Sequence, residues 1–377
     1  MKLQDVSTPR LLLDRTRLRN NIRTMAQRMD GLGGVLRPHV KTHKSFGVLE
    51  EVMKHGTVKG ITVSTLKEAA YFFEKGVTDI LYAIGMTAPK FDDAAALIQA
   101  GCTLTMVLDS TDIATAAVQA GDRLQTMLPF LIEIDVDQHR AGVQPESGTL
   151  LDIAQILEGG AFTSLKGVMT HAGESYACTT HDELLTAARN ERDKTVMAAN
   201  RLRQAGYNCA DVSIGSTPTI CTIDDLTGVT EVRPGVYTFF DLVMAGIGVC
   251  SIDNIAIGVL ATVIGHQKER GWVLTDAGWM AMSRDLGTAS QADDYGYGLV
   301  CDLDGNPIPD IHFARANQEH GIITGANGKP PPFERLSIGT QVRILPNHAC
   351  ATAAQYPAYD VVDAGQIIDR WDRAYGW

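Results

Sequence analysis

The sequence predicts an α/β fold in which a TIM-type (β/α)8 barrel is followed by a second, mostly antiparallel β domain. Three observations lead to this prediction. Short apolar runs alternate with helical stretches up to about Leu242. The first of these runs ends at a lysine, and no glycine-rich dinucleotide turn follows it. After Leu242 the chain changes to β-rich runs separated by Gly, Asn, Asp and Pro.

The apolar runs of the first part are nearly continuous, as the strands of a parallel sheet covered on both faces are. They lie at 35–40, 60–63, 79–84, 103–108, 129–136, 165–170, 211–214 and 231–239. Alanine-rich or amphipathic stretches between them predict helices at 65–75, 88–100, 111–119, 150–157 and 182–204. Eight such units in about 230 residues fit a (β/α)8 barrel, which we assign to residues 16–242.

An open, doubly wound sheet is the alternative to the barrel. That fold would call for a GxGxxG turn after its first strand. Here the first run leads into Lys41 without such a motif, and the barrel is therefore the preferred prediction.

The second domain is expected to comprise residues 243–377 together with the N-terminal strand region 1–15. A short strand is predicted at 9–14, and a helix at 16–30 starts the barrel. Further β-rich runs lie at 254–264, 271–276, 297–302 and 341–345. A helical pattern is expected again only in the last dozen residues.

Composition narrows the function classes. The chain has 377 residues, 45% of them hydrophobic, and a net charge of −11, with a pI of about 5.4. This acidity argues against nucleic acid or an anionic membrane as a partner. There is no apolar run of about 18 residues and no signal-peptide pattern at the start of the sequence. Seven scattered cysteines without CxxC spacing are typical of a reduced, cytoplasmic protein.

A lysine at the end of the first apolar run is the first candidate for catalysis. It is Lys41, within Arg37-Pro38-His39-Val40-Lys41-Thr42-His43-Lys44. A lysine at a strand end can point into a pocket, lose its proton when desolvated and form a Schiff base. The alternative is a basic surface loop.

Four more predicted strands lead into polar segments, as expected where the functional side chains of a barrel gather. These segments are Asp137-Gln138-His139-Arg140-Ala141-Gly142-Val143, Thr170-His171-Ala172-Gly173 with Tyr176 beyond it, Gly215-Ser216-Thr217-Pro218-Thr219, and Arg233-Pro234-Gly235-Val236-Tyr237.

Each of these segments also has a structural interpretation. Ser216 and Thr217 could cradle a phosphate or simply cap a helix. His171 could stack on a planar ligand or form hydrogen bonds in the core. Arg140 could pair with a ligand atom or with Asp135 or Asp137. Glu231 and Arg233 could form a structural pair.

The second domain contains a candidate metal site in Leu345-Pro346-Asn347-His348-Ala349-Cys350. On an extended backbone, His348 and Cys350 would project to the same side. An imidazole and a thiolate are ligands of zinc or a similar ion, and two ligands leave positions open for water or substrate. The alternative is a buried cysteine beside a turn histidine.

Taken together, these motifs resemble the fold-type III pyridoxal-phosphate (PLP) enzymes, which include alanine racemase. Within that family they resemble the branch of D-threonine aldolase and eukaryotic-type D-serine dehydratase. The motifs that carry the resemblance are Arg37-Pro38-His39-Val40-Lys41-Thr42, His171-Ala172-Gly173, Gly215-Ser216-Thr217-Pro218-Thr219, Asp276-Ala277-Gly278, Asn317-Gln318-Glu319-His320-Gly321 and Pro346-Asn347-His348-Ala349-Cys350. They span nearly the whole chain.

The resemblance implies a role for each candidate residue. Lys41 would hold PLP as a Schiff base and act as general base. Arg140 would face the pyridine nitrogen, His171 would support the ring and Tyr176 would lie near the phenolic oxygen. The phosphate site would be lined by Gly215, Ser216, Thr217, Gly235 and Tyr237.

The resemblance also implies that His348 and Cys350 bind a catalytic divalent metal such as zinc, manganese or cobalt. In the aldolases of the branch the second ligand is aspartate, whereas in the dehydratases it is cysteine. Cys350 therefore follows the dehydratase pattern.

The activity implied is a lyase that dehydrates a D-3-hydroxyamino acid. 3-Hydroxyaspartate would give oxaloacetate and ammonia, and D-serine would give pyruvate. The alternatives are an aldolase acting on D-threonine or 3-hydroxy-D-aspartate, an amino-acid racemase with Tyr295, Tyr297 or Tyr356 as second base, and a PLP carrier protein. The family also implies a homodimer. For a second substrate carboxylate, His43, Arg284 and His320 are unranked candidates.

Overall fold

The computed structural model describes residues 1–376 and divides them into two compact units. The first, which we call the barrel unit, comprises Thr24–Lys41 and Val52–Gly235. The second, the sheet unit, comprises Met1–Arg23, Thr42–Glu51 and Val236–Gly376. The domain boundaries expected from the sequence, at residues 15/16 and 242/243, stay a prediction.

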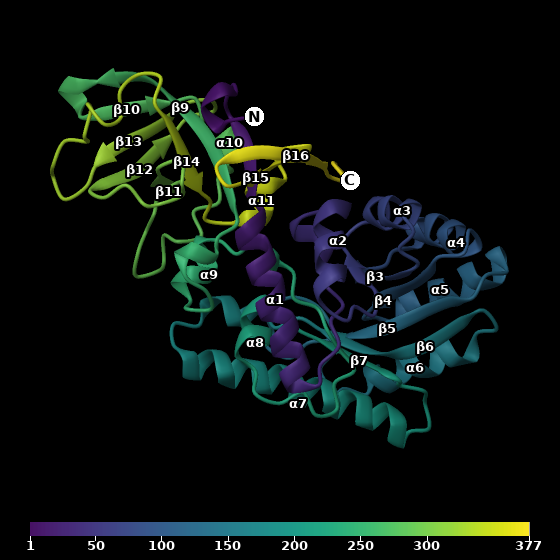
Figure 1. Cartoon of the computed structure of the whole chain (residues 1–377). Coiled ribbons are helices and arrows are strands. Elements are labelled where there is room, and N and C mark those ends of the chain that lie inside the picture. The colour runs from purple at the N-terminus through teal and green to yellow at the C-terminus, as the bar shows by residue number, and fades with distance from the viewer. Residues whose placement is uncertain (377) are drawn as a thin grey trace. The chain divides into compact units, whose positions relative to one another are not determined.

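The barrel unit contains a curved parallel sheet whose strands follow one another in chain order, which confirms the predicted fold class (Figure 1). Its strands are β2 (Ile61–Val63), β3 (Asp79–Gly85), β4 (Thr103–Leu108), β5 (Leu128–Ile134), β6 (Thr163–Thr170), β7 (Asp211–Ile214) and β8 (Glu231–Val232).

The segment before Lys41 occupies the place of the remaining strand. Leu36 forms parallel bridges to both Val58 and Val232, and the Arg37 N–H donates to the Val232 carbonyl at 2.8 Å. The segment therefore lies between β8 and β2 and completes the ring. It forms isolated bridges because Pro38 has no N–H to give to a ladder.

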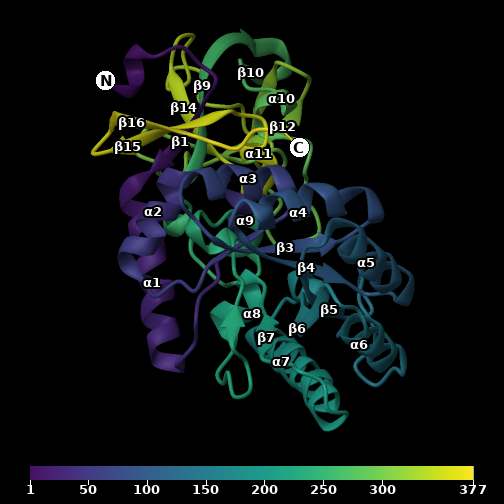
Figure 2. The same cartoon turned by 90° about the vertical axis from the view of Figure 1, so that its right-hand side faces the viewer.

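Helices cover the outer side of this sheet, and Figure 2 shows four of them, α4 to α7, beside strands β3–β6. The helices of the barrel unit are α3 (Leu66–Glu74), α4 (Phe91–Gln99), α5 (Thr111–Leu124), α6 (Thr149–Gly159), α7 (His181–Gln204) and α8 (Thr217–Thr222). Thr65, Ser110 and Thr180 cap α3, α5 and α7 by accepting a backbone N–H bond. Two further helices, α1 (Arg15–Leu32) and α2 (Phe46–His55), begin in the sheet unit.

Side chains from four neighbouring strands form one buried layer of the barrel unit. Leu81, Val107, Leu131 and Met169 come from β3, β4, β5 and β6, and each is almost fully buried. Burying such a side chain contributes about 1.5–3 kcal/mol to stability. The apolar runs of the sequence are therefore explained by strands that contact the interior on one face and helices on the other.

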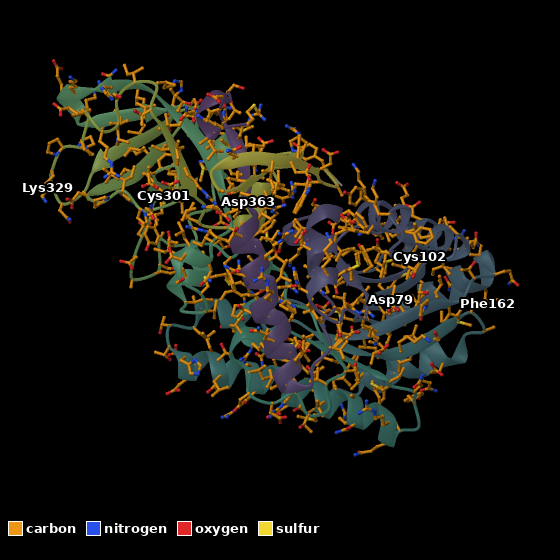
Figure 3. All side chains as sticks on the ribbon, viewed as in Figure 1. Asp79, Cys102, Phe162, Cys301, Lys329 and Asp363 are labelled. Carbon is orange, nitrogen blue, oxygen red and sulfur yellow. The ribbon has the colours of Figure 1, made fainter. Side chains whose placement is uncertain are left out.

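The sheet unit is built on a nine-stranded, mostly antiparallel sheet in which β1 (Arg10–Asp14) pairs with β9 and, in parallel, with β15. Figure 3 labels Cys301 of β11 in this sheet and Asp79 of β3 in the barrel unit. The other strands are β9 (Ile257–Gln267), β10 (Trp272–Thr275), β11 (Leu299–Cys301), β12 (Ile311–Ala316), β13 (Gly321–Gly325), β14 (Gln341–Leu345), β15 (Ala358–Asp363) and β16 (Gln366–Asp372). Its short helices are α9 (Leu242–Gly246), α10 (Trp279–Met282) and α11 (Ala349–Ala353).

The helical pattern expected in the last dozen residues is wrong, because β16 lies there and pairs with β15. Ile367, Ile368 and Trp371 are β-branched or aromatic, and such residues favour a strand where a neighbouring strand offers its edge. Within residues 1–376, no helix combines the length and the hydrophobicity that crossing a membrane requires.

Candidate active site

The candidate residues fall into two groups, one in each unit. The barrel unit holds Lys41, Arg140, His171, Tyr176, Gly215, Ser216, Thr217 and Gly235, whereas the sheet unit holds Tyr237, His348 and Cys350.

Lys41 lies in a 3-10 turn, η2 (Val40–Thr42), directly after the bridging segment, and its side chain is exposed. Its N–H donates to His39 Nδ1 at 3.4 Å. Burial lowers the pKa of His39 well below its ordinary value, and the charges of Lys41 and Arg233 lower it further. The ring of His39 is therefore neutral beside the lysine at physiological pH.

His171 follows β6 and belongs to the same electrostatic neighbourhood. Burial lowers its pKa to about 3, with further contributions from Lys41 and Arg140. Its ring centroid is 6.2 Å from that of Tyr176, which lies in the turn η4 (Gly173–Ala177). The structure thus brings together the ends of three predicted strands, with a neutral imidazole among cationic side chains.

Arg140 lies in the loop after β5 and is half exposed, and its nearest ion-pair partner is Glu133 at 3.8 Å. The pairing with Asp135 or Asp137 that the sequence left open is replaced by this one. Asp135 Oδ1 instead accepts the N–H groups of Asp137 and Gln138. Asp135 therefore stabilises the backbone of the loop, and the Arg140 guanidinium pairs with Glu133 instead.

Ser216 and Thr217 are buried where β7 leads into α8. Ser216 is the N-cap of α8 and accepts the Thr219 N–H, so the capping interpretation holds. Thr217 Oγ1 accepts the Gly235 N–H at 3.3 Å, which links the ends of β7 and β8. Gly215 has a φ of +116°, and a Cβ there would lie 2.7 Å from Ile220. Only glycine fits this turn.

A buried ionic network lies beneath these residues. Arg37 Nε is 2.8 Å from Glu231 Oε2, and the same guanidinium binds both oxygens of Asp79 at 2.8 and 3.1 Å. Arg233 donates to Ser213 Oγ at 2.6 Å and to the Thr170 carbonyl. Glu231 is thus the partner of Arg37, which replaces the expected Glu231–Arg233 pair.

The candidate metal ligands lie at the end of β14. His348 is the N-cap of α11 and has an extended backbone, but Cys350 lies in the first turn of that helix. The expectation of an extended pair is therefore wrong for Cys350. His348 Nδ1 lies 2.6 Å from Asp285 Oδ2, and Cys350 Sγ donates to Thr42 Oγ1 at 3.4 Å.

This donor set fits a divalent transition metal. Asp285 contacts Nδ1 of His348, as carboxylates do beside metal-binding histidines, and the His348 side chain also forms a hydrogen bond with Cys350, so the two proposed ligands lie together. Among residues 1–376 there is no cluster of three or more His, Cys, Asp or Glu side chains in metal-binding geometry. A metal on this pair would therefore take further ligands from water or substrate.

Tyr237 lies in the turn η5 (Val236–Thr238), where its side chain is fully buried. Burial raises the pKa of its hydroxyl. It is therefore a neutral hydrogen-bonding group at physiological pH.

Two residues near the candidate sites had escaped sequence analysis. Asp285 is 63 positions from His348, and Glu191, from the middle of α7, bonds to the ends of β6 and β7. Nothing in the sequence marked Asp285 as a histidine partner. For Glu191 the sequence offered one indication, which is a carboxyl group at a core-facing position of the helix predicted at 182–204.

Comparison with known proteins agrees with this picture. Residues 13–243 match the family described as alanine racemase, N-terminal domain, and residues 256–362 match a serine dehydratase domain. D-threo-3-hydroxyaspartate dehydratase from Delftia sp. (strain HT23) is 49% identical, with 100% of this chain and 99% of that protein covered. D-serine dehydratase from Dictyostelium discoideum is 32% identical, with 100% and 98% covered.

Among solved structures, a cysteine-to-alanine mutant of D-threo-3-hydroxyaspartate dehydratase in the metal-free form has a TM-score of 0.98 and 48% identity. Both chains are covered completely. A likeness to this dehydratase was also expected from the runs Asp276–Asp285 and Gln355–Tyr359, and the comparison confirms it. The chain therefore belongs to the alanine racemase N-terminal domain family of fold-type III PLP enzymes, in the branch that carries a serine dehydratase domain.

Proposed function

We propose that this chain is a PLP- and divalent-metal-dependent lyase that dehydrates D-threo-3-hydroxyaspartate to oxaloacetate and ammonia. The observation that carries the proposal is the His348–Cys350 pair with Asp285 behind it, in a chain 49% identical to a dehydratase of that substrate.

Lys41 is proposed to be the residue that would hold PLP, and its free amine would remove the Cα proton of the substrate. Bound PLP supplies an electron sink for the charge left at Cα, and the metal supplies a Lewis acid for the departing β-hydroxyl. The neutral imidazole of His171 supports the ring without competing for a proton, because its pKa is about 3.

The remaining barrel residues are proposed to orient the cofactor. Arg140 would face the pyridine nitrogen and keep it unprotonated, since a guanidinium does not readily give up a proton. Tyr176 would lie near the phenolic oxygen. The residues that would line the phosphate site are Gly215, Ser216, Thr217, Gly235 and Tyr237.

His348 and Cys350 are proposed to bind the metal and thereby hold the substrate hydroxyl. Zinc suits imidazole and thiolate ligands best, and cobalt and manganese are the proposed alternatives. Cys350 Sγ contacts Thr42 Oγ1 within the sheet unit.

An aldolase is the second candidate function, because it would use the same metal–hydroxyl contact to break Cα–Cβ and release glycine and an aldehyde. Cys350 favours dehydration, since the aldolase pattern of the branch has aspartate at this position. D-Serine is the alternative substrate for the dehydratase reaction. A cytoplasmic homodimer is proposed from the cysteine usage and the family.

Product analysis tests the proposal. The PLP-loaded chain is incubated with D-threo-3-hydroxyaspartate, D-serine and D-threonine, with and without a chelator. We expect ammonia and oxaloacetate from the first substrate, loss of both on chelation and recovery with added divalent metal. Glycine and an aldehyde would establish the aldolase instead. No turnover of any substrate would overturn the lyase proposal.

A further inference from the structure

A fully buried glutamate, Glu191, lies on the inner face of α7. Its Oε1 accepts two backbone N–H bonds, from Ala172 at 3.0 Å and from Gly215 at 3.2 Å. A buried carboxyl is costly unless it is hydrogen-bonded. The burial of Glu191 therefore indicates that its role is to accept these two hydrogen bonds.

The two N–H groups belong to segments that leave adjacent strands. Ala172 follows β6 next to His171, and Gly215 follows β7 next to Ser216. A parallel ladder ends at this edge, so the N–H groups have no strand partner and need an acceptor from elsewhere. One oxygen of Glu191 satisfies both and thereby fixes the distance between the segments.

A serine makes a second link between the same segments. Ser175 Oγ donates to the Ala172 carbonyl at 2.8 Å and lies 3.1 Å from Ser216 Oγ. All of these atoms are buried. The segment proposed to support the PLP ring and the segment proposed to hold its phosphate are therefore joined by Glu191 and Ser175.

The bond to Glu191 also assigns a different task to Gly215. Its N–H donates to the carboxyl, so at the proposed phosphate site Gly215 would supply the tight turn with a φ of +116° and not an N–H bond. Burial raises the pKa of Glu191, against the opposing influence of its hydrogen bonds and of Arg233.

We infer that Glu191 is a positioning residue. It holds the β6–α7 and β7–α8 segments at a fixed distance from each other and so sets the affinity for PLP. This inference rests on the proposed function. Glu191 acts through the backbone of Ala172 and Gly215 and does not itself touch the cofactor.

The test compares three Glu191 variants with a matched control. Glu191→Leu removes both acceptors, Glu191→Asp keeps the carboxyl but shortens its reach, and Glu191→Gln keeps an oxygen acceptor at the original length. The control is Glu68→Leu, because Glu68 is also buried on a helix and accepts a backbone N–H, from Ser64 at 3.0 Å. Ser64 belongs to no candidate site.

Apo protein is titrated with PLP by absorbance at a temperature where each variant is folded, and the bound phosphate is observed by ³¹P NMR. We expect Glu191→Leu to weaken PLP binding by about tenfold to a hundredfold, the cost of leaving a buried N–H unpaired. Glu191→Asp should weaken it to a lesser degree and shift the ³¹P resonance. Glu191→Gln should stay within about threefold of wild type, because an oxygen acceptor is retained. Glu68→Leu should lower Tm without altering Kd or the resonance.

The outcomes separate this inference from the function it rests on. Wild-type Kd and an unshifted resonance in Glu191→Asp would overturn the inference even if Glu191→Leu does not fold. An equal loss of affinity in Glu68→Leu would also overturn it, because the effect would then be general destabilisation. A wild-type chain that does not bind PLP would overturn both.

Discussion

At the scale of single residues, Cys350 is the side chain that most sharply separates the candidate activities. A thiolate binds divalent transition metals strongly, and alanine has no donor atom. Replacing Cys350 by alanine should abolish metal binding and metal-dependent turnover, while the absorbance of bound PLP stays near that of wild type. Metal content per chain and the absorbance spectrum measure the two effects separately.

The matched control for this variant is Cys250→Ala, which removes another partly exposed cysteine of the same unit. It should keep its metal and its activity. A Cys350→Ala protein that retains one metal per chain would contradict the assignment of Cys350 as a ligand.

Asp285 is expected to act on the metal through His348. The 2.6 Å contact at Nδ1 fixes the ring orientation, and removing such a partner typically costs 10- to 100-fold in metal affinity or activity. Asp285→Asn should therefore weaken metal binding by about 10- to 100-fold. Competition with a chromophoric chelator measures this directly.

The control is Asp304→Asn in an exposed loop, which should leave metal affinity unchanged. An Asp285→Asn protein with wild-type metal affinity would show that the carboxylate does not orient the ligand.

At the scale of elements, the loop after β5 depends on a glycine. Gly142 has a φ of +110°, and a Cβ there would lie 2.6 Å from the Asp135 nitrogen. The same loop carries Arg140 and returns to the sheet through a bridge between Ile134 and Val143. The loop can close in this form only without a side chain at position 142.

Gly142→Ala should therefore lower the free energy of unfolding by about 1–3 kcal/mol and alter the absorbance of bound PLP, because Arg140 is displaced. Denaturant unfolding and the PLP spectrum check the two parts. Gly148→Ala is the control, since its Cβ would meet nothing within 4 Å. An unchanged spectrum in a destabilised Gly142→Ala protein would argue against Arg140 at the cofactor.

At the scale of the whole barrel unit, the buried network around Arg37 ties the bridging segment to the sheet. Arg37 and Glu231 are both almost fully buried and lie 2.8 Å apart. Breaking a buried pair by removing one partner leaves an uncompensated charge and costs about 3–5 kcal/mol. Arg37→Met should lower the free energy of unfolding by about this amount near neutral pH.

The effect should depend on pH. Burial by itself raises the pKa of Glu231, but Arg37, Ser213 and Lys59 outweigh it and hold the pKa below its ordinary value of 4.5. A depressed carboxyl pKa gives stability that is present above pH 4.5 and lost as pH falls through the folded pKa. Arg37→Met removes the largest part of this contribution and leaves only Ser213 and Lys59, whose Nζ lies 3.2 Å from Glu231 Oε2. The stability difference between wild type and Arg37→Met should therefore shrink as pH falls below that value.

Urea unfolding followed by far-UV circular dichroism at several pH values measures this difference. The control is Arg123→Met, which breaks the exposed pair with Asp92 and should leave the free energy of unfolding close to that of wild type, because water screens an exposed pair. A difference between wild type and Arg37→Met that stays constant from neutral to acidic pH would exclude Glu231 as the group responsible.

The sequence by itself determined most elements of the barrel unit and the family. Alternating apolar and helical runs predicted the parallel barrel strands, and the change in pattern after Leu242 predicted an antiparallel sheet. These signals are local, because the spacing of apolar residues within a segment indicates which face of that strand or helix is buried. The His348–Cys350 pair and the strand-end segments were found in the same way, from short motifs. Their roles as ligands and as cofactor-binding residues remain predictions.

Only the tertiary structure decided which distant residues meet. It paired Glu231 with Arg37, placed Asp285 against His348 and set Glu191 between the ends of β6 and β7. It also turned the end of the chain into β16, because β15 offered an edge to pair with. Each of these contacts joins residues from different elements, and its geometry depends on how those elements pack. No periodicity within one segment records that information.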